Sequence, residues 1–168
     1  MADPIVEVVT NHGTFVITLD PAKAPKSVEN FLRYVDAKHY ENTIFHRVIK
    51  TFMVQGGGYD KQYERRPTQP PVQNEGDNGV KNTRGTVAMA RTNDPHSATA
   101  QFFVNVVDNA FLDHTRKSDD GWGYTVFGVV TEGMDVVDKI KDLKTGTMGP
   151  FAKDAPLQVV TIETVRRR

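Results

Sequence analysis

Short β-prone runs separated by turn residues recur along this chain, and they limit the folds that it can adopt. The strands are expected over residues 5–9, 14–19, 45–49, 52–55, 86–90, 101–106, 125–130 and 157–165. Apolar residues at helical spacing predict only two helices, near 25–38 and over 134–141. Turns rather than helices connect most of the strands, which favours antiparallel pairing, and closing the sheet would remove its edges. We therefore predict a mainly β protein with one domain over 1–168, a closed eight-stranded antiparallel β-barrel capped by two α-helices.

The charge balance and the composition exclude several classes of protein. The 21 basic and 21 acidic residues cancel, which argues against nucleic acid as the main partner because phosphate binding requires a basic surface. The chain has no cysteine, so disulfides, thiolate catalysis and thiolate-bound zinc are excluded. No apolar run approaches membrane-spanning length, and no signal-peptide pattern is visible. We therefore expect a cytoplasmic monomer without a membrane or nucleic-acid partner.

The third and fourth expected strands combine polar and apolar side chains in an unusual way. Alternate side chains of a strand point to opposite faces, so Arg47 is expected on the same face as Phe45. By the same rule Gln55 shares a face with Met53, and Phe52 lies opposite. A guanidinium and a carboxamide among large apolar groups suit an apolar ligand that also carries amide groups. The alternative interpretation is an ordinary surface arginine on a structural strand.

The remaining polar residues do not predict metal, nucleotide or covalent chemistry. The five histidines are not spaced as a metal pair. His46 lies between Ile44 and Val48, which favours a core histidine with satisfied hydrogen bonds. The glycines at 56–58 lack the lysine of a phosphate loop, and no serine has a nucleophile-elbow context. We expect no metal and no cofactor.

Three segments lack a regular apolar pattern. Residues 57–84 are turn-rich and polar, and a loop of this length inside a compact domain is uncommon and usually functional or mobile. Residues 146–156 are expected to form a loop, and the arginines at 166–168 a solvated tail.

Four sequence blocks, in order along nearly the whole chain, resemble the cyclophilin family. They are Phe45-His46-Arg47-Val48-Ile49 with Phe52-Met53-Val54-Gln55-Gly56-Gly57, Gly85-Thr86-Val87-Ala88-Met89-Ala90, Ser97-Ala98-Thr99-Ala100-Gln101-Phe102-Phe103, and Val126-Phe127-Gly128. The pattern is most similar to the bacterial cytosolic type. The resemblance implies a peptidyl-prolyl cis-trans isomerase that acts on proline-containing peptides and folding proteins without a cofactor, in an eight-stranded barrel with two helices.

The resemblance also implies an active site, residue by residue. Arg47 matches the catalytic arginine, and Gln55 and Gln101 match the glutamines that contact the substrate backbone. Arg91, next to Ala90, falls where the family uses main-chain groups to hold the residue before proline. The residues expected to bind substrate are Phe52, Met53, Ala90, Arg91, Gln101, Phe103, Phe111, Leu112 and Tyr124, with Arg47 and Gln55 as the catalytic pair.

Two positions depart from the eukaryotic pattern of this family. Phe111 stands where those proteins have a tryptophan that contacts cyclosporin, and Tyr124 stands where many have a histidine. Because phenylalanine has no N–H donor, cyclosporin is expected to bind only weakly. Two other hypotheses remain open from the residues alone: a module that binds proline segments without turnover, and a scaffold that uses only the barrel. The intact set around Arg47 favours the enzyme.

Overall fold

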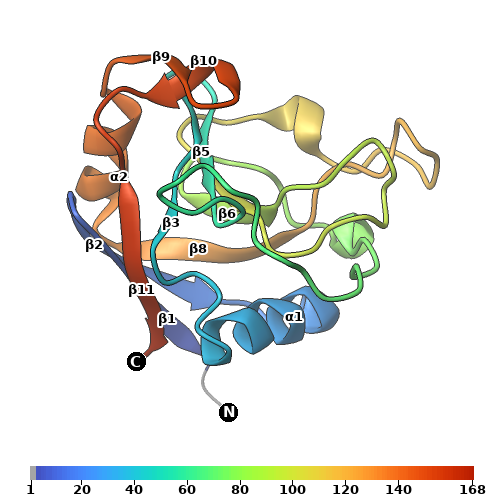
Figure 1. Ribbon diagram of the computed structural model, residues 1–168. Helices are drawn as coiled ribbons and strands as arrows, with labels where there is room; N and C mark the ends of the chain where they lie inside the picture. Colours follow the sequence, from blue (N-terminus) through green and yellow to red (C-terminus); the bar gives the residue numbers. More distant parts are fainter. Residues whose placement is uncertain (1–2) are drawn as a thin grey trace.

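The computed structural model describes residues 3–168 as a strongly curled sheet with a helix at either end (Figure 1). The strands in the described part are β1 (Ile5–Thr10), β2 (Gly13–Leu19), β3 (Thr43–Ile44), β4 (Arg47–Ile49), β5 (Met53–Gly56), β6 (Thr86–Met89), β7 (Phe102–Asn105), β8 (Val126–Glu132), β9 (Thr145–Met148), β10 (Phe151–Pro156) and β11 (Thr161–Arg167). The helices are α1 (Pro25–Asp36) and α2 (Met134–Lys141), with short 3-10 turns η1 (Gly76–Asn78) and η2 (Ala110–Leu112). Both predicted helices are confirmed. No helix within residues 3–168 is long and apolar enough to cross a membrane.

Nine strands form one antiparallel sheet in the order β3-β11-β1-β2-β8-β6-β7-β5-β4. The two edge strands do not pair with each other, so the expected closed eight-stranded barrel is not confirmed. Instead β3 bonds to the segment after β5, where the Ile44 N–H donates to the Tyr59 carbonyl at 2.9 Å. A single strand was expected over 45–49, but residues 45 and 46 belong to no strand and separate β3 from β4. The two edge strands have only two and three residues.

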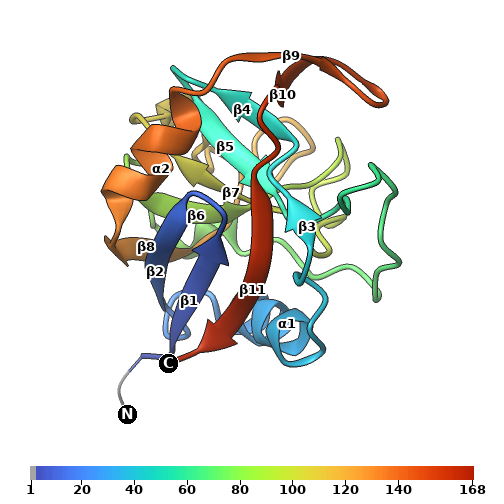
Figure 2. The same cartoon turned by 60° about the vertical axis from the view of Figure 1, so that its left-hand side comes forward.

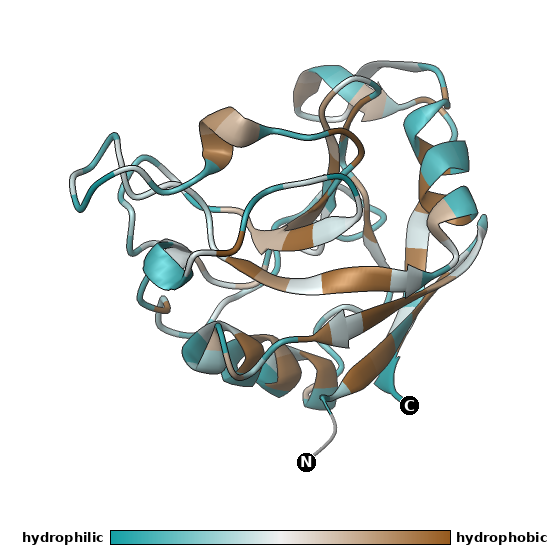
Figure 3. Ribbon diagram, turned by 180° about the vertical axis from the view of Figure 1, so that it is seen from behind, coloured by the Kyte–Doolittle hydropathy of each residue, from teal (hydrophilic) through white to brown (hydrophobic). Residues whose placement is uncertain are grey.

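The core lies between the curled sheet and the two helices. Phe31 of α1 is fully buried and packs edge-on against Phe102 with ring centroids 5.6 Å apart, and against Phe127 at 5.0 Å. Helix α2 lies against β2, β4 and β5, away from α1 (Figure 2). Hydrophilic and hydrophobic residues intermix along both helices, as amphipathic spacing requires (Figure 3). Each helix therefore covers a different part of the core.

A second, smaller apolar cluster lies on the other side of the same strands. Alternation along β7 sends Phe102 and Val104 into the main core and Phe103 into this second cluster. The cluster consists of Met53, Ala88, Ala90, Phe103, Leu112 and Val126. It forms the floor of the candidate site described below.

The predicted faces are wrong at two positions, and the reason is the same in each case. Phe45 is buried in the main core against Phe15 and Phe102, instead of sharing a face with Arg47. Phe52 packs with the second cluster, on the same side as Met53. Neither residue belongs to a strand in the structure, so strand alternation does not apply to them.

The expected loop over 146–156 is wrong, and the arginines at 166–168 are solvent-exposed as expected but do not form a free tail. Strands β9 and β10 form a hairpin, in which Gly149 provides the positive φ of the turn. Strand β11 starts later than predicted and continues to Arg167, pairing with β1. The arginines at 166–168 form ion pairs with Glu7, Asp36 and Glu132, partners that lie far away in the sequence.

Candidate active site

A cavity of about 110 Å³ opens above the second apolar cluster and brings together nine of the eleven predicted site residues. It is lined by Arg47, Phe52, Met53, Gln55, Ala90, Arg91, Phe103, Leu112 and Tyr124. These residues come from β4, β5, β7 and three loops, so only the folded sheet assembles them. One side of the cavity is apolar and the other is polar.

The apolar side is formed by rigid, well-packed groups. Met53, Phe103 and Leu112 are buried, and the rings of Phe103 and Tyr124 meet edge-to-face with centroids 5.8 Å apart. Phe52 is partly buried at the rim. A cavity with such walls can hold a small apolar ring and exclude water from it.

The polar side is a chain of hydrogen bonds that starts at Arg47. Strand pairing places Arg47 directly opposite Gln55. The Arg47 Nη1 donates to Gln55 Oε1 at 3.5 Å, and Gln55 Nε2 donates to Gln101 Oε1 at 3.0 Å. Gly58 leaves the space that Gln101 occupies, because a Cβ at Gly58 would lie 2.5 Å from Gln101 Cδ. Among residues 3–168, the guanidinium thus has one neutral acceptor at a long hydrogen-bond distance, and it keeps donors free for a ligand.

A second cavity of about 200 Å³ adjoins the first and shares Gln55, Ala90 and Arg91 with it. Gln101 lines this second cavity rather than the first. Five further lining residues escaped the sequence analysis, namely Tyr59, Arg65, Thr92, Ser97 and Thr99. An isolated backbone bridge between Tyr59 and Arg65 folds the long loop back toward the site. No local sequence signal points to that bridge.

The Arg91 side chain takes a larger part in the site than the resemblance implied. Its guanidinium carbon lies 4.4 Å from the centroid of the Tyr124 ring. Its Nε donates to the Gly123 carbonyl at 3.0 Å, and its Nη1 donates to the Thr92 carbonyl at 2.8 Å. The side chain is therefore fixed at the junction of the two cavities, where a cation over an aromatic face is stabilised.

Phe111 lies outside both cavities. Its side chain is 74% exposed, and its ring centroid is 5.5 Å from that of Phe52. It extends the apolar rim of the first cavity onto the surface, where an elongated ligand could contact it.

Three buried asparagines hold the walls of the first cavity, and the sequence analysis missed their role. Asn109 Nδ2 donates to the Phe52 carbonyl at 2.9 Å and to Asn105 Oδ1 at 2.8 Å. Asn105 in turn donates to Asn82 Oδ1, and Asn82 donates to the Leu112 carbonyl. Because these amides bond both backbone segments, the network fixes Phe52 and Leu112 relative to each other.

His46 is buried directly beside Arg47, but it is not the satisfied core histidine that was expected. Its ring packs against Tyr59 and Phe151 with centroids 4.8 and 5.0 Å away, and its Nδ1 has no hydrogen-bond partner among residues 3–168. Burial, and to a lesser degree the charge of Arg47, lower the pKa of His46 to about 4. The imidazole is therefore neutral at physiological pH.

The fold and the site define a class: a curled antiparallel sheet with two capping helices, which carries an apolar cavity edged by two arginines and a glutamine. The chain belongs to the cyclophilin type peptidyl-prolyl cis-trans isomerase family, whose sequence model matches residues 5–167. It is thus an enzyme of the peptidyl-prolyl cis-trans isomerase class, as the sequence resemblance predicted.

Relatives and solved structures agree with this assignment. The chain is 59% identical to peptidyl-prolyl cis-trans isomerase cyp18 of Streptomyces antibioticus, over 96% of each chain. It is 56% identical to peptidyl-prolyl cis-trans isomerase B of Escherichia coli, over 93% of this chain and 94% of that protein. Its fold matches a crystal structure of a Cryptosporidium parvum cyclophilin type peptidyl-prolyl cis-trans isomerase, determined in the presence of the dipeptide Ala-Pro. That match has a TM-score of 0.79 and 24% identity, and it covers 98% of each chain.

Proposed function

We propose that this enzyme accelerates rotation about X-Pro bonds by holding the proline ring in the first cavity while Arg47 donates a hydrogen bond to the prolyl nitrogen. The observation that carries the proposal is the position of Arg47, directly across from Gln55 at the edge of the cavity. The Ala-Pro dipeptide present with the Cryptosporidium parvum protein supports proline-containing peptides as the substrates.

The chemistry of the X-Pro bond explains why an arginine is useful there. Conjugation between nitrogen and carbonyl gives a rotational barrier of about 18–20 kcal/mol. At the twisted midpoint this conjugation is lost, and the nitrogen becomes pyramidal and able to accept a hydrogen bond. A donor that bonds the nitrogen only then stabilises the transition state selectively. A charged donor contributes about 1.5–3 kcal/mol, which corresponds to roughly ten- to a hundredfold in rate.

The remaining groups of the cavity have supporting roles in this mechanism. The apolar wall removes water from the imide, and Gln55 can donate to the carbonyl oxygen as it rotates. No proton is transferred and no covalent intermediate forms. The lining of the first cavity contains neither a carboxylate nor a histidine, which is consistent with a reaction that needs no general base.

The decisive measurement is the cis-to-trans exchange rate of a short X-Pro peptide by exchange NMR, with peptide binding measured separately by chemical-shift titration. We expect fast exchange with the wild type and a loss of about ten- to a hundredfold with Arg47→Ala. An exposed arginine on α1 supplies the matched control, and Arg33→Ala should leave the rate unchanged. Binding without acceleration by the wild type would contradict the mechanism and leave a module that only captures proline segments.

Two extensions of the proposal concern ligands. We propose folding polypeptides as physiological substrates, because the first cavity has the size and apolar walls for a proline ring of any chain. We also propose that cyclosporin binds weakly, because exposed Phe111 offers a ring without an N–H donor. Phe111→Trp should strengthen cyclosporin binding in calorimetry and leave turnover of small peptides nearly unchanged. The single domain, the monomeric state and the cytoplasmic location stay predictions.

A further inference from the structure

The arginines of this chain fall into two groups. Six of them form ion pairs with carboxylates, namely Arg33, Arg84, Arg116, Arg166, Arg167 and Arg168. Within residues 3–168, the other four have no carboxylate partner: Arg47, Arg65, Arg66 and Arg91. Three of these four, all except Arg66, line the two adjoining cavities. Unpaired guanidinium groups are thus concentrated at the site.

The cavities carry a net positive charge that the rest of the molecule does not share. No aspartate or glutamate is among the residues that line either cavity, whereas three arginines are. The chain as a whole is neutral, with 21 basic and 21 acidic residues. Charges of one sign along a recessed surface concentrate their field there and attract ligands of opposite sign.

The two guanidinium groups of Arg91 and Arg65 suit a carboxylate better than a diffuse basic surface would. Arg91 is held by two backbone carbonyls and the Tyr124 ring, so it binds without losing side-chain freedom. Two of the five N–H groups of a guanidinium are occupied in these bonds, which leaves three for a ligand. Arg65 lines the second cavity together with Arg91 and the hydrogen-bonded Gln55–Gln101 pair. A planar guanidinium favours carboxylates in forked geometry.

We infer that the preferred substrates of this enzyme carry a carboxylate side chain close to the proline, bound in the second cavity between Arg65 and Arg91. This inference rests on the proposed function, since it places the proline ring in the first cavity. The two cavities share Gln55, Ala90 and Arg91, so a peptide with its proline in one reaches the other within a residue or two. A lysine at the same peptide position is disfavoured, because like charges repel.

The test compares matched peptides that differ only in charge. Each contains one X-Pro bond, with glutamate, glutamine or lysine placed one or two residues before or after the proline. We expect the glutamate peptide to exceed the glutamine peptide in kcat/KM by about fivefold at low salt, as for a partly exposed ion pair. The advantage should appear on one side of the proline and disappear near 1 M salt, where the Debye length is about 3 Å. Equal rates for all three peptides on both sides would overturn the inference.

Variants assign the effect to the named residues. Because each variant is judged by its glutamate-to-glutamine ratio, a general change in activity does not affect the result. Arg65→Gln and Arg91→Gln should each bring the ratio toward one. Arg66→Gln is the matched control, since this substitution removes the same charge from the neighbouring position. The Arg66 side chain lies outside the cavities, where it donates to the His39 carbonyl. An equal fall of the ratio in Arg66→Gln would overturn the assignment to the second cavity.

The same experiment separates failure of the inference from failure of the proposed function. If the wild type accelerates no peptide, the proposed function is wrong. If it accelerates the glutamine peptide but shows no preference for glutamate, the proposed function stands and the substrate preference is wrong.

Discussion

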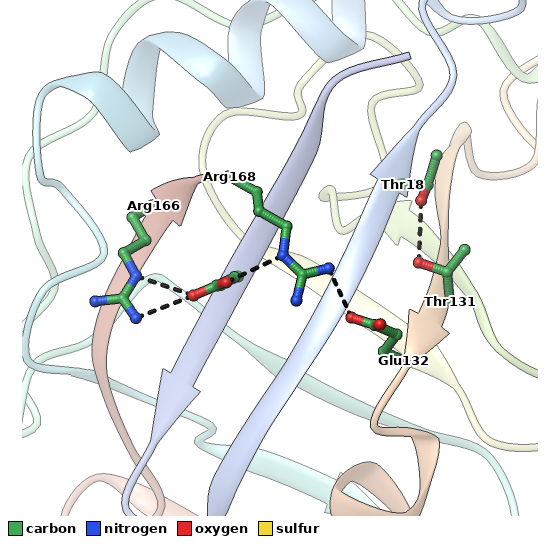
Figure 4. A network of polar contacts seen from close by, with 6 residues as sticks. Thr18, Thr131, Glu132, Arg166 and Arg168 are labelled. Carbon is green, nitrogen blue, oxygen red and sulfur yellow. Dashed lines mark hydrogen bonds and ion pairs between the residues drawn. The ribbon is translucent and has the colours of Figure 1, made fainter. Parts of the chain in front are cut away.

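The C-terminal end of the molecule and the active site use arginine in opposite ways. Two arginines at the end of strand β11 and Arg168 directly after it have partners from other elements: Glu7 of β1, Asp36 of α1 and Glu132 of β8. Figure 4 shows Arg168 reaching across to Glu132, with Arg166 on the far side of β1. Arg167 forms a forked pair with Asp36, at 2.8 and 2.7 Å. These pairs join the last strand to its neighbours.

At the active site, neutral acceptors replace the carboxylates. Arg47 bonds the amide oxygen of Gln55, and Arg91 bonds two backbone carbonyls. A carboxylate partner would neutralise the charge and occupy the donors, whereas an amide or carbonyl orients the guanidinium and leaves its charge available. Whether an arginine of this protein has a structural or a binding role therefore depends on whether its hydrogen-bond acceptor is a carboxylate or a neutral group.

The largest expected effect concerns the active-site region, where we expect the free energy of unfolding to fall at low pH. His46 beside Arg47 has a pKa of about 4 in the folded protein, against an ordinary value of 6.5. The unfolded chain therefore takes up this proton first, and stability is complete above about pH 6.5 and falls as the pH approaches 4. Two and a half pKa units correspond to roughly 3 kcal/mol. Urea unfolding of the wild type between pH 7 and pH 4 measures this loss.

The control for acid stability is His46→Leu, which removes the titrating group and keeps an apolar side chain of similar size. Its unfolding free energy should change less over the same pH range. The C-terminal pairs should remain intact there, because the hydrogen bond from Arg167 holds the pKa of Asp36 below its usual value. An equal pH dependence in the variant and the wild type would show that His46 is not the group responsible.

The next largest effect concerns replacement of arginine by lysine, made once at the active site and once at the C-terminal end. Arg47→Lys keeps the charge but loses the planar fork and its reach, and we expect about a tenfold or greater loss of isomerase rate. Arg167→Lys loses the forked geometry toward Asp36 and should reduce stability by less than about 1 kcal/mol, with no effect on rate. Exchange NMR and urea unfolding on both variants check the two expectations. A rate loss in Arg167→Lys would remove the distinction between the regions.

Most of the regular fold was predictable because its signals are local. The turn at Asn11-His12-Gly13 and the apolar spacing of α1 and α2 lie within a few residues of the elements that they define. The hairpin β9–β10 gave no such signal, because no residue of β9 and only the last two residues of β10 are buried, so no apolar run marks these strands. The open edge between β3 and β4 depends on how residues 43–46 pair across the molecule, which no local pattern specifies.

The candidate site was predictable from strand patterns where it lies on strands, and from the family resemblance alone where it lies on loops, as at Leu112 and Tyr124. Arg47, Gln55 and Phe103 keep the positions that strand pairing and the family resemblance gave them. Arg65 lines the second cavity because the backbone bridge to Tyr59 folds its loop toward the site. Asn82 supports the site through a buried hydrogen bond from its side-chain amide to the Leu112 carbonyl. The partners of these residues are distant in sequence, as are those of the C-terminal arginines, so local sequence reasoning could not assign them.

A smaller loss of stability is expected when a C-terminal arginine loses its carboxylate partner and so resembles the arginines of the active site. Glu7→Gln leaves Arg166 without a carboxylate, while Arg168 keeps Glu132. Exposed ion pairs contribute about 0.2–1 kcal/mol each, so we expect a loss of about 1 kcal/mol in urea unfolding and no change in rate. High salt should narrow the difference. The control is Glu163→Gln, which removes an exposed carboxylate of β11 that has no ion-pair partner in the described part of the chain. A loss of the same size in that variant would contradict the role of the pairs.

The smallest effect reports whether the charge of Arg47 is felt by its neighbour. Burial is the main cause of the low pKa of His46, and the charge of Arg47 is the second. Arg47→Gln should therefore raise the pKa of His46 while leaving it well below 6.5, which NMR titration of the imidazole ring measures. Arg167→Gln removes an arginine that already has a carboxylate partner and should leave the titration unchanged. If Arg47→Gln also leaves it unchanged, the charge of Arg47 does not reach the buried ring, and the acid sensitivity of the site comes from burial alone.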